Sequence, residues 1–126
     1  LDVDTFKGIN DRFGHDGGDE TLRKFAEIAR ETMRSADLIG RLGGEEFALI
    51  MPDTDRIQAS MAAERLREAI ARRHFVLPRG ALVPVTTSVG VADYRSGDGP
   101  DELIARADEA LYEAKHAGRN LTRLAA

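Results

Sequence analysis

The feature that most constrains the fold is a pair of glycines between two short apolar segments. Gly43 and Gly44 separate residues 37–42 from residues 47–51, and both segments have the length of a β-strand. A Gly-Gly pair between two such segments is a strong signal for a β-hairpin. The sequence therefore predicts two adjacent antiparallel strands joined by a tight turn.

Two glutamates, Glu45 and Glu46, follow directly after the predicted turn. Glutamate is depleted in strands, and two like charges repel each other. Successive strand residues point to opposite faces, so we do not expect the two side chains to share one role. A divalent cation would offset the repulsion, because Mg²⁺ is held by one or two carboxylates together with substrate phosphates. Taken alone, the segment is more typical of a hairpin tip that is simply solvated.

Composition excludes several classes of protein. The chain has 126 residues, enough for one domain with a hydrophobic core, and no cysteine, so it can form neither disulfides nor thiolate zinc sites. No apolar run reaches the roughly 18 residues that span a membrane, and no secretory leader is recognisable. The net charge of −4 argues against a nucleic-acid groove. We expect a cytoplasmic protein with no nucleic-acid partner and no membrane segment.

The segment before the hairpin predicts the end of a strand followed by two helices. Residues 1–4 have the pattern of a buried strand that starts abruptly, so we expect a longer protein whose earlier part is missing here. Residues 6–13 have apolar side chains at helical spacing, and Gly14 is expected to end this short helix. Gly17-Gly18 is expected to form a second break, after which Asp19 opens a longer helix.

The segment after the hairpin predicts helix, strand, helix and a short final strand. The first helix is expected to begin with Thr54 or Asp55 as its cap and to end near residue 74, before an edge strand around 75–77. Residues 83–94 alternate between apolar and polar side chains, which predicts one strand. A last helix over residues 101–117 and a strand within 120–124 complete the chain.

This order of elements predicts an α/β (α+β) fold with a central, mostly antiparallel sheet flanked by helices. It is compatible with a palm-like, ferredoxin-related sandwich, in which the end of the first strand would place Asp2 near Glu45. Two such carboxylates are the minimal holder for two metal ions about 3.5–4 Å apart. Neither a Walker A loop nor G-x-G-x-x-G occurs, so phosphate would be bound by cationic side chains and backbone N–H groups. The candidates are Lys7, Lys115 and Arg119, although the last two could simply cap a helix.

Five motifs extend over essentially the whole chain. They are Asp2-Val3-Asp4-x-Phe6-Lys7-x-x-Asn10-Asp11, Gly14-His15-x-x-Gly18-Asp19, Arg41-x-Gly43-Gly44-Glu45-Glu46-Phe47, Ser88-x-Gly90-Val91-Ala92 and Ala107-Asp108-x-Ala110-Leu111-Tyr112-x-Ala114-Lys115-x-x-Gly118-Arg119-Asn120. In order and spacing they resemble the GGDEF domain of bacterial diguanylate cyclases. The signature hairpin would be residues 43–47, in its GGEEF form.

The resemblance implies that two GTP condense to cyclic di-GMP with loss of two pyrophosphates. Each domain would bind one GTP in an antiparallel homodimer, and the 3′-hydroxyl of one nucleotide would attack the α-phosphate of the other. The implied cofactor is Mg²⁺, two ions per half-site, with Mn²⁺ able to substitute. The family's D-x-L-T-x-L-x-N-R-like segment and its regulatory domain are absent from this sequence. We therefore expect residues 1–126 to be a single domain without its usual start, preceded by a regulatory domain in the full protein.

By position, the resemblance makes Asp2 and Glu45 metal ligands, with the Val3 carbonyl assisting. Glu46 would belong to the metal site or its immediate surroundings, and Lys7 would contact phosphate, so that Glu45, Glu46 and Lys7 form the catalytic set. The sequence does not decide which carboxylate helps to deprotonate the attacking hydroxyl.

The remaining nucleotide contacts also follow from the resemblance. Asn10 and Asp19 match guanine-reading positions, and their chemistry is suitable because a carboxylate accepts from guanine N1–H and N2–H while an amide can bond O6 or N3. Lys115 and Arg119 match further phosphate-contacting positions. The two hairpin glycines would let the backbone approach the nucleotide closely.

A second site is predicted at an RxxD sequence formed by Arg34 and Asp37. This is where the family has its product-inhibitory site, and Arg65 matches a further arginine that joins it in some members. Arginine is suitable because its planar group binds phosphate in a bidentate manner and stacks on purines. The alternative is that Arg34 only compensates a helix C-terminus while Asp37 begins a turn.

Three functional hypotheses follow: an active diguanylate cyclase, which we favour; a non-catalytic GGDEF module that binds GTP or cyclic di-GMP as a regulator; and another palm-type nucleotidyl enzyme. Asn10, Asp19 and the RxxD sequence argue against the third. His15 could be proposed as a general base, but it has no partner visible in the sequence and is interpreted as structural.

Overall fold

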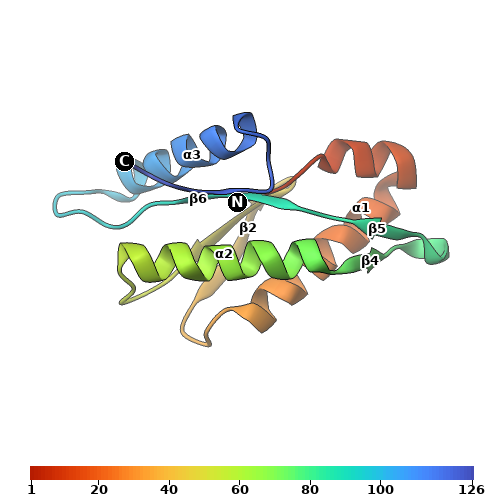
Figure 1. Cartoon of the computed structure of the whole chain (residues 1–126), viewed down its shortest axis with the longest axis horizontal. Helices are drawn as coiled ribbons and strands as arrows, with labels where there is room; N and C mark the ends of the chain where they lie inside the picture. The colour runs from red at the N-terminus through yellow and green to blue at the C-terminus, as the bar shows by residue number, and fades with distance from the viewer.

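The computed structural model describes all 126 residues as a five-stranded sheet with three helices packed around it (Figure 1). The elements are β1 (Asp2–Val3), α1 (Phe6–Thr32), β2 (Leu38–Gly43), β3 (Glu46–Ile50), α2 (Arg56–Arg72), β4 (His74–Val76), the 3₁₀ turn η1 (Pro78–Gly80), β5 (Leu82–Pro84), β6 (Thr87–Val91), α3 (Pro100–His116) and β7 (Thr122–Leu124). None of the helices has the length and apolar character needed to cross a bilayer.

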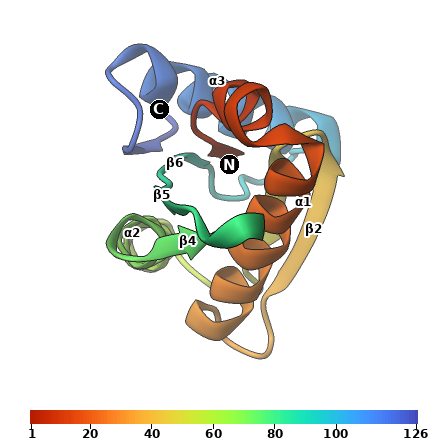
Figure 2. The same ribbon diagram turned by 90° about the vertical axis from the view of Figure 1, so that its right-hand side faces the viewer.

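The central sheet has the order β2-β3-β1-β6-β7. Every neighbouring pair is antiparallel except β6 and β7, which are parallel. The prediction of a mostly antiparallel sheet flanked by helices is therefore confirmed. The short strand β1 occupies the middle position, and Figure 2 shows the N-terminus at the centre of the molecule. Each residue of β1 is consequently flanked by residues of two neighbouring strands, β3 and β6.

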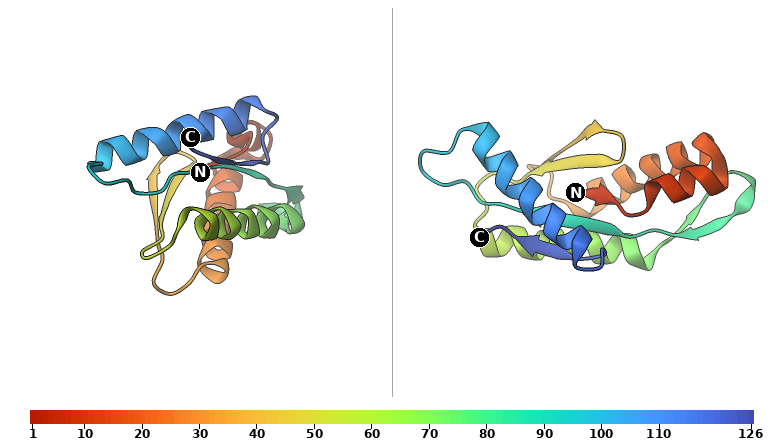
Figure 3. Two further views of the ribbon diagram at one scale, coloured as in Figure 1. Left: turned by 60° about the vertical axis from the view of Figure 1, so that its left-hand side comes forward. Right: turned by 90° about the horizontal axis from the view of Figure 1, so that it is seen from above.

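The helices lie on both faces of the sheet (Figure 3): α3 covers one face, and α2 with the second part of α1 lies on the other. The largest buried cluster is built around Phe25, Ile28, Leu66 and Phe75, and the ring of Phe25 packs on Phe47 of β3 at a centroid distance of 4.9 Å. Because both faces are covered, β6 is buried on both of its sides, including the polar Thr87 and Ser88. This sandwich fixes β1 and the hairpin relative to α3.

The helix α1 differs from its prediction. Gly14 produces the expected interruption, since its φ of 78° and ψ of 173° are not helical, but Gly17 and Gly18 do not break the chain. Both are buried inside the helix, and a Cβ on Gly17 would lie 2.6 Å from the Cβ of Phe13. These glycines allow the two parts of α1 to approach each other, and the prediction that Asp19 begins a helix is wrong.

The predicted strand over residues 83–94 is also divided in the structure. Its first part, β5, pairs with β4 in a separate two-stranded ribbon, while β6 pairs with β1 and β7. The alternating pattern continues through both parts, so it could not reveal that they have different partners. At the start of α2, Asp55 is the cap and forms a capping box with Gln58, which decides between the two predicted cap residues.

Candidate active site

The centre of the candidate site is Asp2 on β1, whose partners by strand register are Glu46 of β3 and Ser88 of β6. The expectation that the first strand ends beside the hairpin is thus met. The backbone of Glu45 lies next to β1 as well, because its carbonyl accepts a hydrogen bond of 3.2 Å from the Val3 N–H. Directly opposed residues in a sheet share a face, so the acidic side chains of Asp2 and Glu46 are neighbours, an arrangement that is destabilising without a nearby cation.

Lys115, in the last turn of α3, supplies a cation at this point. Its Nζ forms an ion pair with Oδ2 of Asp2, which is only 3% exposed. The other oxygen of the same carboxylate, Oδ1, is buried without any hydrogen-bond partner. A buried carboxylate oxygen without a partner is costly, and such groups often mark the position of an ion or a ligand. Lys115 therefore does more than cap its helix.

The residues present are suited to bind Mg²⁺ only together with a ligand that supplies further oxygen atoms. No group of three or more Asp, Glu, His or Cys side chains is arranged to hold a metal by itself. The available donors are Oδ1 of Asp2 and the half-buried carboxylates of Glu45 and Glu46. Mg²⁺ typically retains several waters and is bound by one or two carboxylates plus phosphate oxygens. The donor set is consistent with that mode and not with a complete protein cage.

The hairpin turn has the geometry that its glycines predict. Gly43 and Gly44 have φ angles of 154° and 50°, and no atom lies within 4 Å of the position a Cβ would occupy on either residue. The turn is held from the side by Arg41, whose Nε donates to the carbonyl of Gly44 over 2.8 Å. Arg41 opens the quoted hairpin motif, two residues before the glycine pair, but no role was predicted for it.

The kink at Gly14 brings Asn10 and Asp19 to the same part of α1. The Oδ1 atom of Asn10 lies only 1.8 Å from the position that a Cβ on Gly18 would occupy. The Asn10 carboxamide therefore packs directly on the glycine that precedes Asp19. Asp19 is exposed at one end of a groove of about 360 Å³. The groove lies between α1 and β2 and is lined by Asp19, Leu22, Arg23, Ala26, Arg30, Ile39, Gly40, Arg41 and Phe47. Apolar walls beside a carboxylate can accommodate a flat ring that carries N–H donors.

The remaining predicted contacts are less enclosed. Lys7, in the first turn of α1, is exposed, and so is His15, which directly follows the kink. Arg119 is exposed in the turn between α3 and β7, where it adopts a φ of 63°. Asp4 received no role from the sequence, yet it is buried and accepts three hydrogen bonds.

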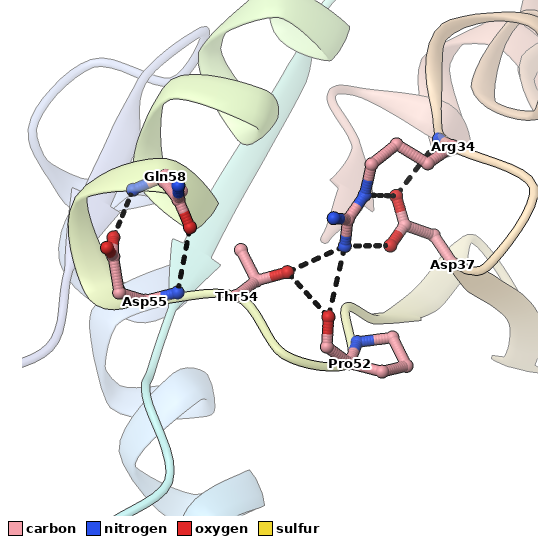
Figure 4. Close-up of polar contacts among 6 residues, drawn as sticks. All are labelled: Arg34, Asp37, Pro52, Thr54, Asp55 and Gln58. Carbon is pink, nitrogen blue, oxygen red and sulfur yellow. Dashed lines mark hydrogen bonds and ion pairs between the residues drawn. The ribbon is translucent and has the colours of Figure 1, made fainter.

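The RxxD sequence forms a compact polar cluster between α1, β2 and α2 (Figure 4). Nη2 of Arg34 lies 2.9 Å from Oδ1 of Asp37 and also donates to the carbonyl of Pro52 and to Oγ1 of Thr54. The hydrogen bond from Arg34 lowers the pKa of the Asp37 carboxyl below its ordinary value. Arg65 is exposed on α2 and is not one of the partners of this cluster. The structure thus joins two of the three predicted residues.

Several known proteins are similar to this chain in sequence and in fold. The family described as "Diguanylate cyclase, GGDEF domain" matches residues 1–121. The response regulator PleD of Caulobacter vibrioides is 48% identical over 122 residues, which are 95% of this chain and 27% of PleD. The diguanylate cyclase DgcP of Pseudomonas aeruginosa is 42% identical over 120 residues, again 95% of this chain and 18% of DgcP.

Among solved structures, the GGDEF domain of DgcB from Caulobacter crescentus in complex with c-di-GMP superimposes with a TM-score of 0.92 at 32% identity. The match covers 98% of this chain and 73% of that one. The chain spans less than a third of the length of the two relatives named above. With a family match over nearly all of its residues, this chain belongs to the GGDEF domain family of diguanylate cyclases.

Proposed function

We propose that this chain is an active diguanylate cyclase domain that condenses two GTP into cyclic di-GMP and releases two pyrophosphates. The observation that carries the proposal is the unpaired, buried oxygen of Asp2, which lies beside Glu46 and the ion pair with Lys115. A member that has lost metal-dependent nucleotide binding would gain nothing from this costly arrangement of buried charges. General support comes from the relative DgcP, which is named as a diguanylate cyclase.

The metal would be held by Asp2, Glu45 and Glu46, with the Val3 carbonyl assisting. When bound, Mg²⁺ neutralises phosphate charge and polarises the α-phosphoryl group. The carboxylates contribute negative charge that retains the ion, and Lys115 limits the repulsion between them before nucleotide arrives. Phosphoryl-type transfer depends chiefly on positioning and on charge neutralisation, which is what these side chains supply.

The nucleotide itself would lie across the kink of α1 and the hairpin. Asn10 and Asp19 would bond the edge of guanine, while the open space above Gly43 and Gly44 would let phosphate oxygens approach backbone N–H groups. Lys7, Lys115 and Arg119 would neutralise the phosphates.

Each chain carries one such set of groups, so the reaction requires two domains. The 3′-oxygen of one GTP forms a bond to the α-phosphorus of the other, the bond from that phosphorus to the bridging oxygen of pyrophosphate breaks, and the hydroxyl proton passes to a carboxylate or to solvent. Repetition in the other direction closes the ring. We propose a homodimer for this reason, and product binding at Arg34, Asp37 and Arg65 as its feedback control.

The experiment that tests the proposal is incubation of the intact protein with GTP and Mg²⁺. We expect cyclic di-GMP and pyrophosphate in a ratio of one to two, and neither product with ATP. Binding of GTP, measured by calorimetry, without release of pyrophosphate would instead identify a regulatory GGDEF module. A product other than the cyclic dinucleotide would identify a different nucleotidyl enzyme.

A further inference from the structure

Asp4 is a buried carboxylate that has no cationic partner. It is 5% exposed, and its two oxygens accept hydrogen bonds only from neutral groups. Oδ1 accepts from the Ser88 hydroxyl at 2.6 Å, and Oδ2 accepts from the Thr86 hydroxyl at 2.8 Å and from the backbone N–H of Asn120 at 2.9 Å. Burying a carboxylate is expensive unless it is well hydrogen-bonded, so these three donors offset the cost of its burial.

The third donor belongs to the turn between α3 and β7, whose backbone is strained. Arg119 and Asn120 have φ angles of 63° and 49°, in the left-handed region that residues other than glycine seldom occupy. Such conformations persist only when the surrounding structure holds them in place. Here the Asn120 N–H is bound by Asp4, and the Asn120 side chain accepts from Nη1 of Arg67 on α2 at 2.6 Å. The turn is therefore held at one residue from two sides.

The residue beside this anchor point is Arg119, which is exposed. Asp4 directly follows β1; its carboxylate contacts the turn after α3, and the carboxylate of Asp2 contacts Lys115 in the last turn of α3. One short segment thus contacts α3 through Asp2 and the following turn through Asp4. The Arg119 N–H donates to the Ala114 carbonyl at 3.0 Å, and the Asp4 contact holds the next residue, so these two bonds together set the backbone direction of Arg119.

We propose that Asp4 is a positioning residue for nucleotide binding: by holding the Asn120 N–H, it fixes the strained turn that presents Arg119 to the phosphates of GTP. This inference rests on the function proposed above. It adds a residue that contacts neither the nucleotide nor the metal but determines how tightly the phosphates are bound. Thr86 and Ser88 support the carboxylate and are not themselves connected to the turn.

Substitution Asp4→Asn tests the inference with little change in shape. Hydrogen bonds to a charged acceptor are roughly twice as strong as those to a neutral one, so the turn should be held less firmly. We expect the Kd and the KM for GTP to rise about tenfold, with kcat changed less than about threefold, because uniform binding of substrate and transition state is lost. Thr86→Val is the matched control, since it removes one support of Asp4 but leaves the Asn120 contact. It should lower the thermal midpoint without changing GTP affinity.

Combination with Arg119→Ala separates positioning from general damage. If Asp4 acts through Arg119, Asp4→Asn should have less than about a twofold further effect on GTP affinity once Arg119 is already alanine. Amide hydrogen exchange supplies a readout that needs no activity and no variant: the Asn120 N–H of the wild-type protein should be protected. Asp4→Asn should increase its exchange rate more than it increases the rates of core amides.

Three results would overturn the inference: an unprotected Asn120 amide in the wild type, unchanged GTP affinity in Asp4→Asn, or fully additive effects of the two substitutions. These outcomes presuppose a wild-type protein that binds GTP. If the wild type neither binds nor converts GTP, the proposed function fails first and the positioning role fails with it, which distinguishes the two results.

Discussion

At the scale of single residues, the site is defined by contacts between segments far apart in the sequence. Motif spacing pointed to Asp2, Asn10, Asp19 and the hairpin glutamates, because each belongs to a short pattern. It could not show that Lys115 pairs with Asp2 or that Asp4 accepts a bond from Asn120, since these contacts join positions 113 and 116 residues apart and depend on how α3 lies on the sheet. Local sequence patterns therefore identify candidate site residues, whereas tertiary packing determines which residues they contact.

Gly18→Ala should weaken guanine recognition by displacing the Asn10 side chain. A Cβ at this position would meet Oδ1 of Asn10 at 1.8 Å and Cζ of Phe6 at 3.1 Å, so the flexible carboxamide would have to move away and the Phe6 ring would have to shift slightly. Alanine is also the better helix former by roughly 1 kcal/mol. We expect a higher KM for GTP, reduced preference for GTP over ATP and a thermal midpoint close to that of the wild type, because the gain in helix propensity offsets the local crowding. Gly8→Ala is the matched control, because no atom lies within 4 Å of its Cβ position; equal base preference in both variants would contradict a role for Gly18 in placing Asn10.

Asp19→Ala tests the second residue that is predicted to contact guanine. Leaving the N–H edge of guanine without an acceptor costs roughly 1–3 kcal/mol, or about a tenfold loss of GTP affinity. The relevant measurement is the ratio of kcat/KM for GTP and ATP. If the variant discriminates between them as well as the wild type does, Asp19 does not read the base.

At the scale of elements, the Arg34–Asp37 cluster ties the end of α1 to the segment that leads into α2. Arg34→Ala should therefore lower stability at neutral pH as well as weaken product binding. The pKa of Asp37 is lowered in the folded state, so its contribution is present above the ordinary aspartate pKa and is lost as pH falls through that range towards the lowered value.

The measurement is the free energy of unfolding of wild type and Arg34→Ala at pH 7 and near pH 3. The difference between the two proteins should shrink at the lower pH. Calorimetric titration with cyclic di-GMP at neutral pH then tests the product site, where we expect about tenfold weaker binding in the variant. A constant stability difference, or an unchanged affinity for product, would limit this cluster to one of its two roles.

Elements were predictable to the extent that periodicity alone defines them. The hairpin, α2, α3 and the short β7 follow from apolar spacing and turn residues. The continuity of α1 through Gly17 and Gly18 did not, because a glycine that ends a helix and a glycine that permits close packing look identical in one sequence. The division of residues 83–94 into β5 and β6 was missed for a similar reason: alternation reports which side chains are buried and not which strand pairs with which.

At the scale of the whole molecule, the proposed function gives one chain the groups for one nucleotide only, which is why we propose a homodimer. Turnover should then depend on protein concentration. Below the dimer dissociation constant, the specific activity should rise in proportion to concentration, and it should level off above it. Initial rates over a hundredfold dilution series test this, with analytical ultracentrifugation on the same samples. A specific activity that is independent of concentration while the protein is monomeric would contradict the requirement for two domains.

The measurement that tests the account most directly is the rate of pyrophosphate release by Glu45→Gln and wild type at matched protein concentration, with saturating GTP and Mg²⁺. The substitution removes a ligand charge but preserves the shape of the hairpin residue. We expect turnover to fall about 10²-fold or more, by comparison with removal of other groups that stabilise transition-state charge, while the thermal midpoint stays the same. Turnover close to that of the wild type would contradict the claim that the hairpin carboxylates hold the metal for this reaction.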